Sequence, residues 1–180
     1  MKRFTVDDVL AWDPCDGYGR ARLLELFGKR KSITVRGTLR LPIPPADILW
    51  AVLRVDVLPE RTLHLLACDF AEHVQRPDAD PRSLHVIATK RRWVDGAATD
   101  AELRASHVAA AEAARDAFAA GAKAVAKADA AWAVGYAEAG YAADEAAYAA
   151  AYAAADEARK AERQWQVERV LEMLRLKGTP

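Results

Sequence analysis

Apolar residues recur at helical spacing in some segments of the chain and alternate with polar residues in others. Leu63, Leu66 and Phe70 share one face at the 3.6-residue period, which predicts a helix over residues 60–75. Residues 32–41 instead show near-alternation of apolar and polar side chains, which predicts a short extended segment or β-hairpin. The pattern therefore predicts mainly helices, with one short β element.

Proline divides the chain into two regions. All prolines except the terminal one lie between Pro14 and Pro81, so residues 1–100 favour short helices joined by turns, while residues 82–179 permit long helices. Asp80 before Pro81 predicts the start of a helix that ends near Gly96. Thr99 and Glu102 form a capping-box pattern that predicts the start of the next helix.

Alanine dominates the second region. Between Ala101 and Ala161, 31 of 61 residues are Ala, the residue with the highest helix propensity. One straight helix over residues 101–176 would be about 114 Å long, whereas a compact domain of this size has a radius of gyration of about 16 Å. We therefore expect bends or breaks near Gly121 and between Gly135 and Gly140.

These elements predict an all-α protein. Residues 1–100 would form a bundle of short helices, and residues 101–180 would add long Ala-rich helices that pack with it as one structural unit. Large apolar side chains return in the last helical segment, which we expect to dock on the Pro-containing region.

Charge and cysteine content exclude several function classes. The chain has 26 basic and 26 acidic residues, so it lacks the strong positive field that a dedicated nucleic-acid binder uses. Two cysteines far apart in sequence do not make a disulfide scaffold. No signal-peptide pattern and no uncharged 18-residue apolar segment occur, so we expect a soluble cytoplasmic protein.

Catalytic and metal-binding motifs are missing from the sequence. It has no Gly-rich phosphate loop, no Gly-x-Ser-x-Gly elbow and no His-Glu-x-x-His zinc helix. His64, Cys68 and Glu72 follow one another at i+4 steps, but the economical interpretation is that they border the apolar helix face. We therefore predict a protein that is not an enzyme and needs no cofactor or metal.

Two basic clusters could bind an anion if the fold brings them together. One is Lys29, Arg30 and Lys31; the other is Lys90, Arg91 and Arg92 beside Trp93. Basic groups next to an aromatic ring can hold a phosphate and stack a base. Apart in space, they would be solvated helix ends or loops.

An acidic, Tyr-rich interval offers a different kind of site. Residues 128–158 contain six acids and no Lys or Arg. On one helix, Glu138, Glu145 and Asp156 would project near Tyr141, Tyr148 and Tyr152. Tyr supplies contact area with little rotamer entropy to lose, so these six residues are candidates for binding a protein partner. The alternative is that the tyrosines pack on Ala with their hydroxyls at the solvent edge.

Four segments carry a resemblance to a known family. They are Asp47-Ile48-Leu49-Trp50, residues 67–74 (ACDFAEHV), the Ala-rich tract, and residues 162–166 (ERQWQ) leading into residues 171–174. In this order, over roughly residues 40–176, the chain resembles the immunity proteins of the Imm5-like kind and related small proteins of phages and prophages. It departs from them in its charged residues within the tract and in its Trp12-Asp13-Pro14-Cys15 opening.

The resemblance implies a protein of a bacterial or phage-containing cell that binds another protein and neutralises it. The preferred hypothesis is stoichiometric occlusion of a toxin or effector. Alternatives that stay open are a phage-encoded inhibitor of a bacterial defence system, such as an anti-CRISPR protein, a binder or sponge for a small anionic ligand, and a homo-oligomer joined through Ala faces.

Overall fold

The computed structural model describes residues 2–75, 79–117, 122–136, 138–153 and 156–176. Short elements come first: β1 (Arg3–Phe4), α1 (Val6–Ala11), a 3-10 turn η1 (Asp16–Tyr18), α2 (Arg20–Phe27), β2 (Ile33–Thr34), α3 (Val35–Thr38) and α4 (Pro45–Val52). Six longer helices follow: α5 (Glu60–Gln75), α6 (Pro81–Val94), α7 (Asp100–Ala117), α8 (Ala122–Val134), α9 (Ala139–Ala153) and α10 (Asp156–Leu176). The predicted all-α class is confirmed.

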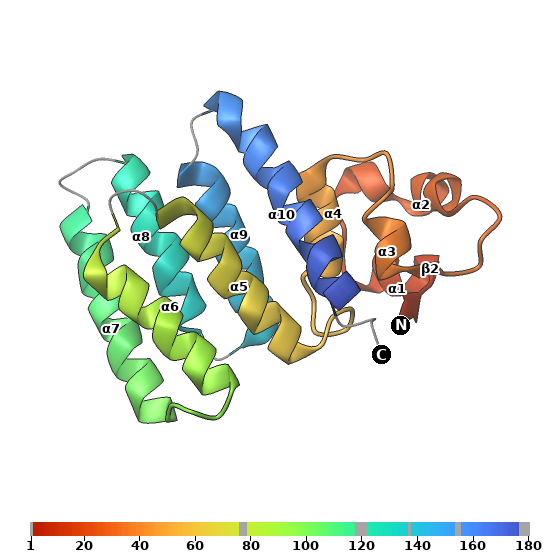
Figure 1. Cartoon of the computed structure of the whole chain (residues 1–180). Helices are drawn as coiled ribbons and strands as arrows, with labels where there is room; N and C mark the ends of the chain where they lie inside the picture. Colours follow the sequence, from red (N-terminus) through yellow and green to blue (C-terminus); the bar gives the residue numbers. More distant parts are fainter. Residues whose placement is uncertain (1, 76–78, 118–121, 137, 154–155, 177–180) are drawn as a thin grey trace.

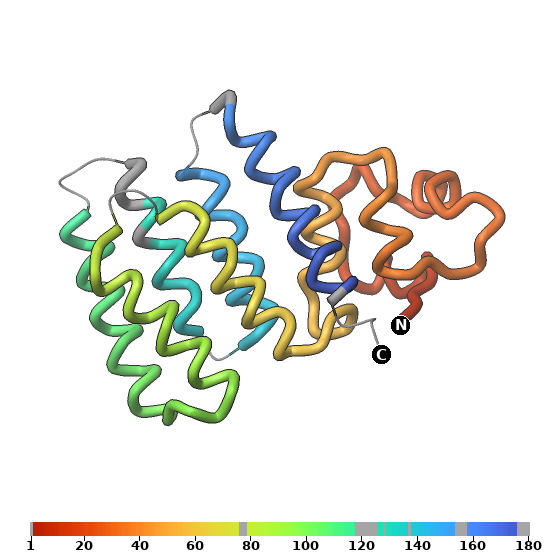
Figure 2. Tube along the Cα trace, in the orientation of Figure 1, coloured from red at the N-terminus to blue at the C-terminus, as the bar shows by residue number. Residues whose placement is uncertain are grey.

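The long helices form a stack of roughly antiparallel neighbours. Helices α5 and α6 lie on α7, α8 and α9, and α10 lies between this stack and the short N-terminal elements (Figure 1). The tube in Figure 2 shows the end of α10 near the N-terminal elements. The predicted docking of the closing helix is confirmed, because α10 packs on α4 and Arg36 donates to the carbonyl of Leu174 at 3.0 Å.

Local sequence signals explain most helix ends. Asp80 caps α6 with Pro81 in its first turn, and Glu102 accepts from the backbone of Thr99 in the predicted capping box. Gly28 ends α2 with a φ of +59°, a conformation that only Gly adopts without strain.

The β prediction needs a correction. Residues 32–41 do not form a hairpin, because β2 pairs antiparallel with β1, with Phe4 opposite Ile33, and residues 35–38 are the helix α3. Thr34 is the physical reason, since its side chain accepts from the backbone of Gly37 and begins a helical turn. The alternating pattern identified a real strand but not its partner.

The Ala-rich tract breaks where Gly predicts it. The chain leaves the helical path between Val134 and Ala139, which confirms the break at Gly135 to Gly140, whereas Gly121 lies outside the described residues. A Cβ atom on Gly135 would lie 2.5 Å from the ring of His107, so Gly lets α8 end against α7. Helices α9 and α10 are separate elements that pack on each other, although the sequence between them contains neither Gly nor Pro.

The core combines two kinds of packing. Helix α5 contributes Leu63, Leu66 and Phe70, all fully buried, as the 3.6-residue pattern predicts. Helix α9 buries nine Ala residues among its neighbours α5, α8 and α10. Small side chains let helix axes approach closely, so α9 is a central, tightly held element. None of the helices in the described ranges is long and apolar enough to cross a membrane.

Candidate functional site

The three tyrosines lie along one stripe of α9. Tyr141, Tyr148 and Tyr152 are 45%, 51% and 49% exposed, and the buried residues on the rest of the helix are all Ala. We call these three residues the tyrosine face. Their positions seven and four residues apart put them on one side of the helix, as the sequence predicts.

Carboxylates accompany the tyrosine face. Glu145 lies on α9 between Tyr141 and Tyr148, and Glu138 lies directly before the helix, exposed. Asp156 is the first residue of α10, and only its backbone is described. Burial raises the pKa of Glu145, with a smaller contribution from neighbouring Asp144. The predicted acids thus lie before α9, on α9 and on α10 rather than on one helix.

Arginines from α10 cover the tyrosine face from one side, which sequence reasoning missed. The guanidinium carbon of Arg159 lies 4.7 Å from the ring centroid of Tyr152, and that of Arg163 lies 5.9 Å from Tyr148. The two tyrosine rings lie 4.6 Å apart, and a hydrogen bond with Tyr152 raises the pKa of Tyr148. The surface is therefore aromatic and of mixed charge.

A cleft adjoins this face at Tyr141. It has a volume of about 250 Å³ and is lined by residues from α4, the segment after it and the start of α9: Trp50, Leu53, Arg54, Val55, Asp56, Glu138, Gly140, Tyr141 and Asp144. The guanidinium of Arg54 stacks on Trp50, 4.2 Å from the ring centroid, and also lies 5.3 Å from the ring of Trp12. This stacking fixes a long cationic side chain in one place.

Asp144 is the charged centre of the cleft. Desolvation by the surrounding protein atoms raises the pKa of Asp144, although part of the residue is exposed to solvent. The positive charges of Arg163 and Arg54 oppose this shift. Desolvation lowers the pKa of Arg54 and of Arg163, and the negative charge of Asp144 raises both values in part. The tyrosine face thus borders a carboxylate that interacts electrostatically with two cations from distant parts of the chain.

The two basic clusters lie apart. Lys29, Arg30 and Lys31 join α2 to β2 at one end of the molecule, and Lys90 to Trp93 belong to α6 in the helical stack at the other (Figure 1). The guanidinium of Arg30 donates to the carbonyls of Phe27 and Leu26 at 2.8 Å each, so it caps the end of α2. A joint anion site would need both clusters, and the fold separates them.

Lys90 lies inside the protein rather than on its surface. Its side chain is 0% exposed, and its amino group donates to the carbonyl of Tyr136 at 2.7 Å. The same nitrogen lies 4.1 Å from the ring centroid of Trp93. Burial lowers the pKa of Lys90 to about 8. The indole nitrogen of Trp93 in turn donates to Asp100.

Arg91 and Arg92 form ion pairs within the protein. Arg91 binds Asp69 at 2.8 Å and Glu72 at 2.7 Å, which ties α6 to α5. Arg92 binds Glu102 of α7 at 3.2 Å. The contacts of this cluster hold neighbouring helices together.

His64, Cys68 and Glu72 do not converge on a common point. The thiol of Cys68 donates to the carbonyl of Ile87, Glu72 pairs with Arg91, and His64 is buried edge-on to Trp93. Burial, with a smaller contribution from the charge of Lys90, lowers the pKa of His64 to about 4. Among the residues with described side chains, no group of three His, Cys, Asp or Glu is arranged to hold a metal ion.

With this geometry in view, comparison with known proteins assigns the family. Residues 54–173 match the family described as "Imm-5 like putative immunity protein". The chain belongs to this Imm5-like family. No curated protein and no solved structure matches it.

The Imm5-like match has a clear position in the fold. It begins at Arg54, spans α5 to α9 and ends within α10, so it includes the whole tyrosine face and both arginines that cover it. The short elements α1 to α4 lie outside the matched range. Within that range, 15 basic and 20 acidic residues give an excess of negative charge, whereas the whole chain is neutral.

Proposed function

We propose that this Imm5-like protein neutralises a bacterial toxin or effector by stoichiometric binding, and that the tyrosine face makes the contact. The observation that carries the proposal is the half-exposed stripe Tyr141, Tyr148 and Tyr152 within the range matched by the family. An immunity-type role requires a surface for a protein partner, and large aromatic side chains near 50% exposure are the typical anchors of such surfaces.

The physical properties of the surface support a protein ligand. Tyr has few rotatable bonds, so burying it against a partner costs little rotamer entropy. The neighbouring arginines provide planar hydrogen-bond donors, and Arg is enriched in binding hot spots together with Tyr. The negative excess of the matched range favours a partner with a basic surface, since complementary charge speeds encounter.

The first experiment captures and then reconstitutes the complex. The tagged chain retrieves its partner from the native host, the partner is identified, and both proteins are purified. Titration of the partner's activity should reach zero at one chain per partner. The partner's identity separates a toxin from a bacterial defence complex.

The second experiment tests the surface. Tyr141, Tyr148 and Tyr152 are changed together to Ala, and we expect at least 30-fold weaker binding, the equivalent of about 2 kcal/mol lost at one anchor. The matched control changes Leu24, Leu84 and Val108 to Ala, because these apolar residues are also exposed but lie elsewhere. It should bind like the native chain.

Two results contradict the proposal. Unchanged affinity of the triple Tyr variant would show that the partner binds another surface, provided that its circular dichroism matches that of the native chain. Partner activity that persists in the saturated complex would show that binding does not neutralise.

A further inference from the structure

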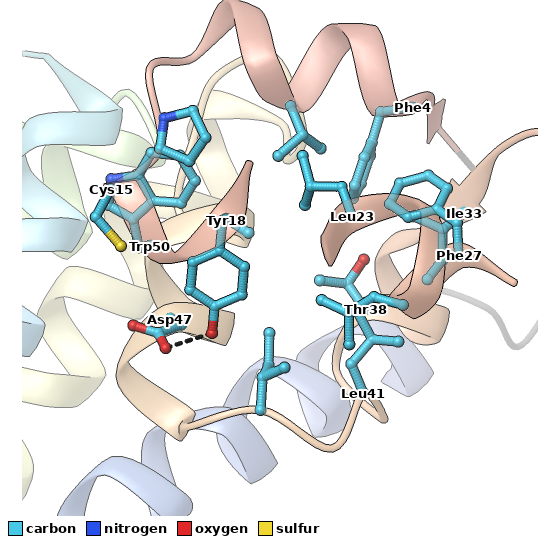
Figure 3. Close-up of a pocket in the computed structure, with 15 residues that line it drawn as sticks. Phe4, Cys15, Tyr18, Leu23, Phe27, Ile33, Thr38, Leu41, Asp47 and Trp50 are labelled. Carbon is cyan, nitrogen blue, oxygen red and sulfur yellow. Dashed lines mark hydrogen bonds between the residues drawn. The ribbon is translucent and has the colours of Figure 1, made fainter. Parts of the chain in front are cut away.

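An apolar cavity lies among the short N-terminal elements, outside the range matched by the family. Its volume is about 200 Å³. Figure 3 shows Phe4, Leu23, Phe27 and Ile33 on one side of it, and all four residues are buried. They come from β1, α2 and β2, so the strand pair and α2 together build this wall.

The space between these buried walls is larger than close packing normally leaves, and it opens to solvent at one edge. Interiors are packed like organic crystals, with few voids larger than a water molecule. An apolar cavity of about 150 Å³ stays dry and accepts benzene. A cavity of about 200 Å³ therefore has room for an aromatic ring or a short aliphatic chain with one small substituent.

Polar groups gather at one edge of the cavity. The hydroxyl of Tyr18 donates to the carboxylate of Asp47 at 2.5 Å, and Figure 3 shows both beside Cys15 and Trp50. Tyr18, Asp47 and Trp50 are half-buried and Cys15 is exposed, so this edge is the mouth. Burial and the bond to Asp47 raise the pKa of Tyr18.

Asp47 determines which head group the mouth accepts. A carboxylate has about four lone-pair sites, and Tyr18 uses one of them. The remaining sites accept a hydrogen bond from a hydroxyl, whereas a second carboxylate would meet like charge in a half-buried setting. Thr38, which also lines the cavity, already donates to the carbonyl of Thr34.

We propose that this cavity binds a small neutral molecule with an apolar ring or short chain and one hydroxyl group. The apolar body lies among Phe4, Leu23 and Phe27, and the hydroxyl donates to Asp47 at the mouth. The site is separate from the tyrosine face, and its test is independent of the immunity-type function.

Three matched probes test the ligand class: benzyl alcohol, toluene and benzoate. Titration calorimetry on the native chain should give a dissociation constant below about 1 mM for benzyl alcohol. Toluene, which lacks the donor, should bind about tenfold more weakly. Benzoate should not compete with benzyl alcohol. The proposal is overturned if benzoate binds most tightly of the three. It is also overturned if benzyl alcohol does not bind at about 10 mM, ten times the expected upper limit of its dissociation constant.

Two substitutions of the same kind locate the binding. Ala51 is buried on α4 and lines the cavity, so Ala51→Leu fills the space. Ala46 lies on the same helix, exposed and outside the cavity, so Ala46→Leu is the matched control. We expect Ala51→Leu to abolish benzyl alcohol binding and Ala46→Leu to leave it unchanged. Equal binding by both variants places the ligand elsewhere and overturns the proposal.

Cys15 gives a readout that does not depend on a variant. Cys68 is fully buried and burial raises its pKa to about 12, so iodoacetamide reaches the exposed Cys15 in the native chain. Saturating benzyl alcohol at the mouth should slow the alkylation of Cys15 several-fold. If Ala51→Leu fails to fold, this rate decides: an unchanged rate in the presence of bound benzyl alcohol overturns the proposal.

Discussion

Replacing Lys90 with Met should change how the stability of the protein depends on pH. The amine is fully buried, where it donates to the carbonyl of Tyr136 and lies over Trp93. Burial lowers the pKa of Lys90 from 10.5 to about 8 in the folded chain. The unfolded chain keeps the ordinary value, so the two states bind different numbers of protons between these limits.

The sign follows from which state holds the extra proton. Between about pH 8 and 10.5 the unfolded chain is protonated at Lys90 and the folded chain is not, so the free energy of unfolding rises with pH. Below pH 8 both states are charged, and the full cost of burying the ammonium is present. One pKa unit corresponds to 1.36 kcal/mol, so the whole effect is about 3 kcal/mol. About 2 kcal/mol of it falls between pH 7 and pH 9.5.

Urea unfolding at pH 7 and pH 9.5 measures this effect. Lys90→Met removes the titrating group, and the part of the substitution's cost that does not depend on pH cancels when the two pH values are compared. The difference in unfolding free energy between the native chain and Lys90→Met should therefore shift by about 2 kcal/mol between the two pH values. Lys160→Met, at an exposed lysine of α10, should show no such shift.

A neighbouring thiol makes the comparison between variants necessary. Burial raises the pKa of Cys68 from 9 to about 12, so this group lowers stability as pH rises above 9 and partly masks Lys90 in the native chain alone. Cys68 is present in every variant, so its contribution largely cancels in the difference. Parallel pH dependences of the native chain and Lys90→Met would refute the reasoning.

Two further substitutions test how the helices are joined. Asp69→Ala removes the buried carboxylate that binds Arg91 and Arg169 at 2.8 Å each. We expect urea unfolding to show that the free energy of unfolding falls by about 2–3 kcal/mol. A decrease below about 0.5 kcal/mol would contradict a structural role for these ion pairs. Gly135→Ala places a Cβ 2.5 Å from the ring of His107 and 2.8 Å from its Cβ, and we expect the free energy of unfolding to fall by about 1–3 kcal/mol. His107→Ala removes the ring but keeps the Cβ, so it should recover part of this loss in the double variant; additive losses would contradict the close contact.

The helices that the sequence predicts correctly are those whose ends carry local chemistry. Asp80 and Thr99 accept from backbone amides at the first turns of α6 and α7, and Gly28 ends α2, so these limits depend on a few neighbouring residues. The apolar face of α5 repeats over four turns and predicts both its length and its buried side. Such features need no knowledge of the rest of the fold.

The features that the sequence does not reveal depend on distant contacts. The strand at Ile33 pairs with the strand at Phe4. No short turn connects these two strands, so no turn sequence could indicate that they pair. Helix α10 runs back along α9 and onto α4, although the sequence between α9 and α10 contains neither Gly nor Pro. That reversal brings Arg163 to Tyr148, so the mixed charge of the tyrosine face could not be predicted from the acidic interval alone.

Burial of Lys90 was missed for a similar reason. As part of the run Lys90-Arg91-Arg92, it has the composition of a solvated helix end. In the fold α6 packs on α7 and α8, the carbonyl of Tyr136 after α8 accepts a hydrogen bond from the Lys90 amine, and Trp93 covers that amine. Helix periodicity does not predict which of the three cations is buried. That depends on their partners, which lie on different elements of the fold.

The buried Ala face of α9 has a consequence for the timing of complex formation. Helix α9 is held by α5, α8 and α10, and its Ala side chains have no rotamers to reorganise, so the backbone beneath the tyrosines is already in place before any encounter. A partner that docks there need not wait for a slow rearrangement, and diffusion and charge then set its association rate. Tyr substitutions on this helix should accordingly shorten the lifetime of the complex while leaving the association rate nearly unchanged.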